Sequence, residues 1–234
     1  MKTNILIVLT SHSDLGDTGK KTGAWFDEIA APYYTLKDAG AEVTLASPKG
    51  GQVPIDPVSQ SDDFQTYFTR RFKDDAEAQS AIAATKKISD VEMSDFDAIL
   101  HPGGQGPFWD IVSDPDSIHL VEAAWAQDKV VAALCHGVSA LLDAKDENGE
   151  PIVRGRNVTG FSDAEEKEYG TDVVVPFLLQ TELEKRGANY AQGANWAAFT
   201  QQDGRLITGQ NPASSEQVAR LMLAELQKRS AIVT

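Results

Sequence analysis

The sequence has no long hydrophobic run. Its longest apolar stretches, residues 5–9 and 130–134, have the length of a strand and fall well short of the roughly 18 residues of a membrane-spanning helix. Only a few strongly apolar residues follow the first four, too few for the apolar core of a secretory signal, and no lipidation or retention signal is recognised. We therefore expect no membrane association and a cytoplasmic location.

Cysteine is almost absent as well. The single one, Cys135, excludes an internal disulfide and a metal cluster of several thiolates. A lone cysteine is either a buried structural residue or a reactive one, and its neighbours in the sequence have to distinguish the two.

Positive charge is also scarce. Lysine and arginine number 21 against 35 acidic residues, which gives a net charge of −14. A chain this acidic repels a phosphate backbone, so we expect no nucleic-acid partner. The hydrophobic content of 41% still provides for a sizeable core, and the length suits one large domain.

The apolar runs alternate with helical segments, which is typical of an α/β fold with a parallel sheet. We predict one flavodoxin-like domain over residues 1–234, doubly wound, with a mostly parallel sheet and helices on both faces. A charged helical insertion is expected at about residues 60–90, and whether residues 62–89 form a lid is left open. Strands are predicted at 4–10, 42–46, 96–101, 130–134, 157–159, 189–191 and 205–208, and helices at 23–39, 117–128, 135–142, 164–169, 176–186 and 214–229.

The strongest chemical signal is the turn at Cys135, where a buried strand runs directly into an apolar helix. This pattern, residues 132–137, has the layout of a nucleophile elbow. The positive end of the helix is expected to lower the thiol pKa, and the amides of His136 and Gly137 can bind an oxyanion. The site would lie at the carboxyl ends of the strands, where ligands bind in open α/β sheets.

A second glycine-rich loop, residues 101–106, follows another predicted strand. If the two strands are neighbours, Gly103 or Gly104 faces Cys135 across the crevice. Backbone without side chains can approach a ligand closely and expose its amides, so we expect Gly103 and Gly104, with His136, to bind the substrate or an oxyanion. The loop lacks the lysine of a phosphate-binding loop and the spacing of a dinucleotide fingerprint. We therefore predict no cofactor.

Together, residues 22–28, 102–104 and 133–137 resemble the DJ-1/PfpI superfamily, and residues 157–162 and 208–214 resemble its Hsp31-type branch, the glutathione-independent glyoxalases. The resemblance covers roughly residues 4–226. It implies that Cys135 is the nucleophile, His136 its adjacent histidine and Glu28 the acid that reaches the thiol. Glu166, or its neighbour Glu165, would orient the histidine.

Physical arguments agree with these implied roles. A carboxyl at Glu28, held near apolar Trp25 and Phe26, should have a raised pKa and could donate a hydrogen bond to the thiolate. His136 needs a partner on its second ring nitrogen to fix its tautomer, which Glu166 would provide.

The sequence also departs from the family pattern. Many relatives have a histidine after the Gly-Gly pair, where this chain has Gln105, so no proton-transfer role is assigned there. The metal site of two histidines and a carboxylate in larger bacterial relatives has no counterpart among the four histidines that we can match, so no metal is predicted. Because relatives are commonly dimers, the resemblance implies a homodimer.

The resulting functional hypothesis is a lyase of the glyoxalase III type, also called D-lactate dehydratase. It would convert methylglyoxal and similar small 2-oxoaldehydes to 2-hydroxy acids through a hemithioacetal on Cys135, as a detoxifying stress-response enzyme. The alternatives are a cysteine peptidase or amidase, and a holdase chaperone. A glutamine amidotransferase is disfavoured, because that family, which looks similar at the elbow, takes its histidine and glutamate from a His-x-Glu pair late in the chain, and no histidine follows His136 here. A redox-sensing role for Cys135 stays open.

Overall fold

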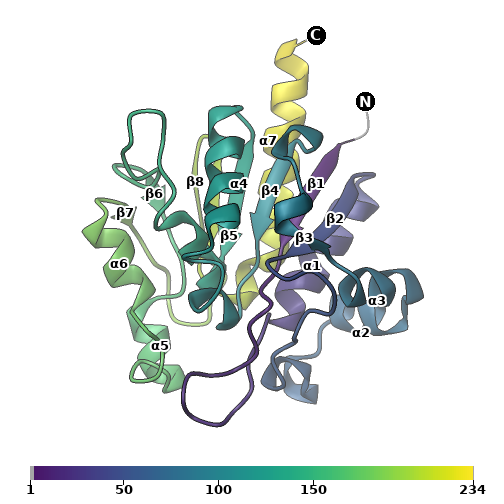
Figure 1. Ribbon diagram of the computed structural model, residues 1–234, viewed down its shortest axis with the longest axis vertical. Coiled ribbons are helices and arrows are strands. Elements are labelled where there is room, and N and C mark those ends of the chain that lie inside the picture. The colour runs from purple at the N-terminus through teal and green to yellow at the C-terminus, as the bar shows by residue number, and fades with distance from the viewer. Residues whose placement is uncertain (1–2, 234) are drawn as a thin grey trace.

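Seven strands form one sheet in the computed structural model, which describes residues 3–233 (Figure 1). Their order across the sheet is β3-β2-β1-β4-β5-β9-β8, and every pair is parallel except β8 with β9. The strands are β1 (Asn4–Val8), β2 (Glu42–Ser47), β3 (Lys86–Lys87), β4 (Ala98–His101), β5 (Val130–Leu134), β8 (Thr200–Asp203) and β9 (Leu206–Gly209). The predicted α/β fold with a mostly parallel sheet is confirmed.

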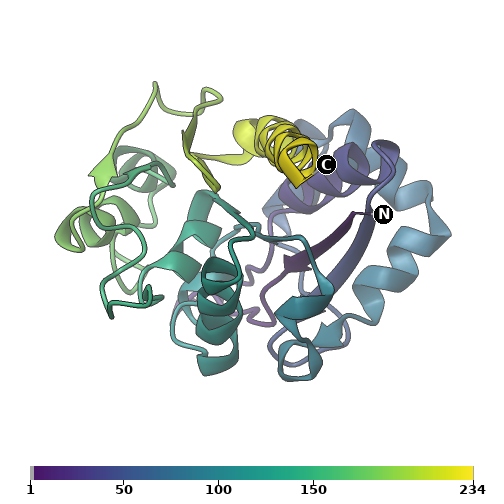
Figure 2. The ribbon, with the colours of Figure 1, turned by 90° about the horizontal axis from the view of Figure 1, so that it is seen from above.

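The central strands are apolar along their whole length because helices cover both faces of the sheet. Helices α1 (Phe26–Asp38) and α7 (Ser215–Val233) cover one face, and α4 (Pro115–Ala126) lies on the other (Figure 2). Strand β5 divides its side chains accordingly, with Val131 and Ala133 in one core cluster and Ala132 and Leu134 in the other. Pro32 lies inside α1, which begins at Phe26 and continues past it.

The register between β4 and β5 places the glycine-rich loop beside the cysteine. His101 is paired with Ala133, so the residues that follow the two strands leave the sheet at the same level. The condition on which the predicted crevice depended, that these two strands are neighbours, is therefore met.

The charged segment after β2 forms two short helices and an edge strand. Helix α2 (Tyr67–Asp74) lies beside α1, and α3 (Ala76–Ala83) packs against α2 and β2. The buried ring of Phe72 packs against Phe26, Tyr33 and Tyr34 of α1. The segment ends in β3, which the prediction of a purely helical insertion missed.

The residues after Cys135 form a 3₁₀ helix, Cys135–Leu141, and not the predicted α-helix. The remaining helices are α5 (Asp163–Tyr169) and α6 (Leu179–Lys185), and a separate parallel pair consists of β6 (Asn157–Val158) and β7 (Asn189–Tyr190). Shorter 3₁₀ turns are Val58–Gln60, Asp62–Phe64, Ile88–Asp90, Met93–Asp95, Gly106–Phe108 and Pro212–Ser214. Among residues 3–233, no helix has the length and apolar character to cross a bilayer.

Candidate active site

Cys135 stands at a sharp turn between β5 and the 3₁₀ helix. Its φ angle is 55°, a left-handed conformation that costs on the order of 1–3 kcal/mol in a residue other than glycine. Such strain persists only where the surrounding structure holds it in place. The elbow predicted from the sequence is therefore present, and the thiol is 3% exposed.

The glycine-rich loop approaches this elbow closely. A Cβ atom on Gly103 would lie 2.9 Å from Cys135 Cβ and 2.7 Å from the His136 amide nitrogen, so only glycine fits there. Gly104 adopts a φ of 86°, and a Cβ atom on it would lie 2.3 Å from the carbonyl oxygen of Gly23. The loop thus faces Cys135, as the prediction required.

His136 connects the thiol to a carboxylate. Its Nδ1 lies 3.3 Å from Cys135 Sγ, and its Nε2 lies 2.8 Å from Glu166 Oε2. An ionised carboxylate can only accept, so Nε2 carries the proton and Nδ1 is left as an acceptor facing the thiol. In this tautomer His136 can take the proton of Cys135.

Glu166 is held as an anion by three donors. Besides His136, it accepts hydrogen bonds at Oε1 from Thr171 Oγ1 and from Gln105 Nε2, at 2.5 and 3.2 Å. Burial opposes ionisation, but the electrostatic attraction and hydrogen bond of His136, with the bonds from Thr171 and Gln105, outweigh it and hold the pKa of Glu166 below its usual value.

The neighbouring Glu165 has a different surrounding. It caps the start of α5 together with Ser162, and its carboxylate accepts hydrogen bonds from the Trp196 amide and from the side chains of Gln210 and Asn211. Of the two acids left open by the sequence, the structure places Glu166 against the histidine and gives Glu165 a structural position.

Glu28 reaches the elbow from the first turn of α1 and is fully buried. Its Oε2 accepts a hydrogen bond of 2.7 Å from the Gly103 amide, while Oε1 is buried and accepts none. Burial raises the pKa of Glu28 to about 8, and the contacts with Cys135 and the Gly103 amide oppose only part of this. At neutral pH the carboxyl is protonated, and Oε1 is the oxygen free to carry the proton.

The pKa of the Cys135 thiol is raised rather than lowered. Burial is the largest cause and the Glu28 carboxyl adds to it, while the His136 amide lowers the pKa by less. The expectation of a thiolate stabilised by the helix N-terminus therefore does not hold in the resting structure, because the turn is too deeply buried. Deprotonation of the thiol needs the base that His136 provides.

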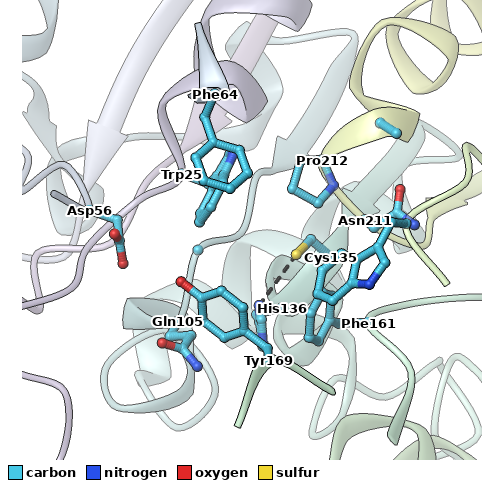
Figure 3. Close-up of a pocket in the computed structure, with 13 residues that line it drawn as sticks. Trp25, Asp56, Phe64, Gln105, Cys135, His136, Phe161, Tyr169, Asn211 and Pro212 are labelled. Atoms are coloured by element: carbon cyan, nitrogen blue, oxygen red, sulfur yellow. Dashed lines mark hydrogen bonds between the residues drawn. The ribbon is translucent and has the colours of Figure 1, made fainter. Parts of the chain in front are cut away.

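A pocket with a volume of about 330 Å³ lies at the elbow (Figure 3). Cys135 and His136 form part of its wall, and the segments that complete the wall come from distant parts of the chain. The lining residues are Trp25, Asp56, Phe64, Gly104, Gln105, Cys135, His136, Phe161, Tyr169, Trp196, Asn211, Pro212 and Ala213.

The three histidines other than His136 are not among the residues that line this pocket. His12 stacks on the ring of Trp109, and His119 is exposed on α4. His101 is buried without a hydrogen-bond partner on either ring nitrogen, and burial lowers its pKa to about 3. Within residues 3–233, no group of three or more histidine, cysteine or acidic side chains could hold a metal ion.

The sequence analysis missed two partners of Glu166. Gln105 was noted only for not being a histidine, and Thr171 carried no signal because it follows a helix end in an ordinary polar loop. Trp196 lies in the pocket wall. Gly103 was expected to help bind an oxyanion, but its amide hydrogen is already donated to Glu28.

Known proteins share both this fold and this sequence over nearly the whole chain. The model of the DJ-1/PfpI family matches residues 26–225. Glyoxalase 3 of Candida albicans is 31% identical over 95% of this chain and 98% of its own length, and the glutathione-independent glyoxalase HSP31 of Saccharomyces cerevisiae is 30% identical over 92% and 94%.

Two crystal structures superpose on this chain over nearly its whole length. The Rapid Encystment Protein 24 KDa of Francisella tularensis superposes with a TM-score of 0.92 at 37% identity, covering 97% of this chain and 99% of that protein. Glyoxalase III of Candida albicans superposes with a TM-score of 0.89 at 30% identity, covering 95% and 97%. The chain, with its cysteine elbow at the end of β5, belongs to the DJ-1/PfpI family.

Proposed function

We propose that the protein is a glutathione-independent glyoxalase that converts 2-oxoaldehydes and water to 2-hydroxy acids. The observation that carries the proposal is the buried thiol of Cys135, which lies between a histidine in the tautomer of a base and a carboxyl whose pKa is raised to about 8. Similarity to Glyoxalase 3 and to HSP31 supports the same activity.

The first step is addition of the thiol to the aldehyde. His136 Nδ1 takes the proton of Cys135, and Sγ forms a bond to the aldehyde carbon C1 while the carbonyl electron pair moves to its oxygen. Gly104 and His136 line the pocket, and their backbone amides can stabilise this oxyanion. Protonation of the oxygen gives a hemithioacetal, and protonated Glu28 can donate to the sulfur.

The second step moves hydrogen from C1 to C2. A base removes the C1 proton, the electrons shift to the C2 carbonyl oxygen and an enediol forms, which is then protonated at C2. Glu28 and His136 both lie beside the sulfur to which C1 is bound. The product is a thioester of the 2-hydroxy acid, and one water hydrolyses it to the free acid and restores the thiol.

The pocket also explains why the proposed reaction needs no glutathione. The chain itself provides the thiol. Among residues 3–233, the pocket lining contains the acid Asp56 but no lysine or arginine that could bind the carboxylates of glutathione. A peptidase is disfavoured by the same geometry, since Cys135 is 3% exposed inside a pocket of about 330 Å³ and not in an open groove that would accept a peptide chain.

The test is production of a 2-hydroxy acid from methylglyoxal without glutathione, by the wild type and by Cys135→Ser. We expect turnover by the wild type and a loss of at least about a thousandfold in the variant, because a hydroxyl is a far weaker nucleophile than a thiol activated by a base. A folded, reduced wild type that makes no lactate would refute the proposal, and peptide and aggregation-prevention assays would then follow.

A further inference from the structure

The pocket is larger and more aromatic than methylglyoxal requires. Five of its lining residues are aromatic, namely Trp25, Phe64, Phe161, Tyr169 and Trp196. Methylglyoxal has only a methyl group beyond its two carbonyl groups, so it would leave most of a pocket of about 330 Å³ filled with water against apolar walls. A volume of this size is at the lower end for pockets that bury a drug-sized ligand.

The aromatic rings come from both sides of the reactive sulfur. In Figure 3, Trp25 and Phe64 lie on one side of the opening, and Phe161 and Tyr169 on the other, near Cys135. Phe64 meets Trp25 edge to face, with ring centroids 5.0 Å apart, and Phe161 meets Trp196 in the same way at 5.6 Å. A flat apolar group on the substrate would contact ring faces and edges, arrangements that stabilise beyond simple burial.

The charges of the lining residues limit which kind of substituent a substrate can carry into the pocket. The polar side chains of the lining are an acid, two amides, the phenol of Tyr169 and the catalytic pair, and none of the lining residues within the described chain is a lysine or arginine. Asp56 is buried, and its carboxylate accepts hydrogen bonds from Thr22 and from the Val58 amide. A negatively charged substituent would meet the carboxylate of Asp56 without a counter-ion, which is costly in a buried site.

From this lining we infer that the preferred substrates are 2-oxoaldehydes whose second carbon carries an uncharged aromatic or similarly flat apolar group. The inference rests on the proposed function and names the substrate class of the same site. For phenylglyoxal the balanced reaction adds one water and gives mandelate, with hydrogen moving from C1 to C2 as described above. The ring would occupy the space between the two aromatic sides.

The experiment compares kcat/KM for phenylglyoxal and methylglyoxal in the wild type, Phe64→Ala and Tyr67→Ala. Phe64 and Tyr67 are both exposed, at 42% and 64%, but only Phe64 lines the pocket. Tyr67 is therefore a matched control for the loss of one exposed ring. Because both substrates are measured on each variant, the difference in their intrinsic reactivity cancels when the ratios are compared.

We expect the wild type to favour phenylglyoxal by at least about tenfold, since differences of one or a few apolar groups in a pocket give discrimination of this order. Phe64→Ala should reduce the ratio by about threefold or more, and Tyr67→Ala should leave it within about twofold. Turnover of methylglyoxal that depends on Cys135, with no preference for phenylglyoxal, overturns the inference and leaves the proposed function intact. Equal effects of the two variants on the ratio also overturn it, and no turnover of either aldehyde overturns both.

Discussion

Glu28 is a carboxyl group in a position where ionisation is costly. Its pKa is raised by burial to about 8 in the folded protein, against 4.5 for a free side chain. The stability that comes from keeping this group neutral is fully present below about pH 4.5 and is lost as the pH rises through about 8. Above that pH, the folded protein must hold a buried negative charge next to Cys135.

Glu28→Gln should therefore be more stable than the wild type in alkaline solution. The amide can still accept the hydrogen bond of the Gly103 amide but never ionises. We expect the difference in the free energy of unfolding to be near zero at pH 5 and to grow to a few kcal/mol near pH 9, with a reduced catalytic rate. Thermal unfolding of both proteins from pH 5 to 9 measures it, and a constant difference would show that Glu28 ionises freely.

Glu166 and Glu165 are adjacent but should respond differently to the same substitution. Glu166→Gln removes the anion that fixes the His136 tautomer, so we expect kcat/KM to fall by about a hundredfold or more with a small change in Tm. Glu165→Gln disrupts the cap of α5 and the bonds to Gln210 and Asn211, so its main effect should be a lower Tm. Equal effects on kcat/KM would contradict the assignment of Glu166 to the histidine.

At this scale, the sequence was sufficient for residues within a recognisable motif. Cys135, His136 and the glycines of the loop lie where their patterns predicted, because a strand end and a tight turn are local features. Gln105 and Thr171 were not predictable as partners of Glu166. Gln105 is 61 residues away in the sequence, so only the fold brings it to Glu166. Thr171 is 5 residues away, but it lies beyond the end of α5 in an ordinary polar loop. The raised pKa of Cys135 was missed because burial depends on the whole fold.

At the scale of the elements, two glycines with similar backbone conformations lie in very different surroundings. Gly104 and Gly40 have nearly the same φ, at 86° and 89°, but different surroundings. A Cβ atom on Gly40 would meet no heavy atom within 4 Å, whereas one on Gly104 would meet the backbone of residues 23–25 at 2.3–2.8 Å. The comparison separates backbone strain from steric exclusion.

We expect Gly40→Ala to lower the free energy of unfolding by about 1–2 kcal/mol, the cost of a left-handed alanine. Gly104→Ala should lower it by about 3 kcal/mol or more, because the loop must also move away from the segment before α1. Chemical denaturation of the two variants measures both values. Similar losses would mean that the loop can shift freely, and the close approach of Gly104 would then have no structural importance.

Strands that are buried on both faces were predicted correctly from the sequence. Strands β1, β2, β4, β5 and β9 were found within three residues of their ends, since strands covered on both faces are continuous apolar runs. The edge strands were missed, because β8 reads Thr-Gln-Gln-Asp and β3 is two lysines. Such polar strands are held by a neighbour that only the fold provides.

The whole molecule carries a large excess of negative charge, −14 at pH 7. Mutual repulsion of like charges destabilises the folded state, while exposed ion pairs such as Arg71–Asp38 contribute little. We therefore expect Tm to rise by several degrees when sodium chloride is increased from about 0.01 M to about 0.5 M, which screens the repulsion. A fall in Tm over this range would mean that the ion pairs outweigh the net charge.

Because the chain has one cysteine and that cysteine lies at the elbow, a thiol count is also an active-site count. A chromogenic thiol reagent applied to the denatured protein reports one equivalent per intact chain, and any shortfall gives the fraction of molecules inactivated by oxidation or alkylation. Specific activities of different preparations can then be compared per working site, without a separate inhibitor titration.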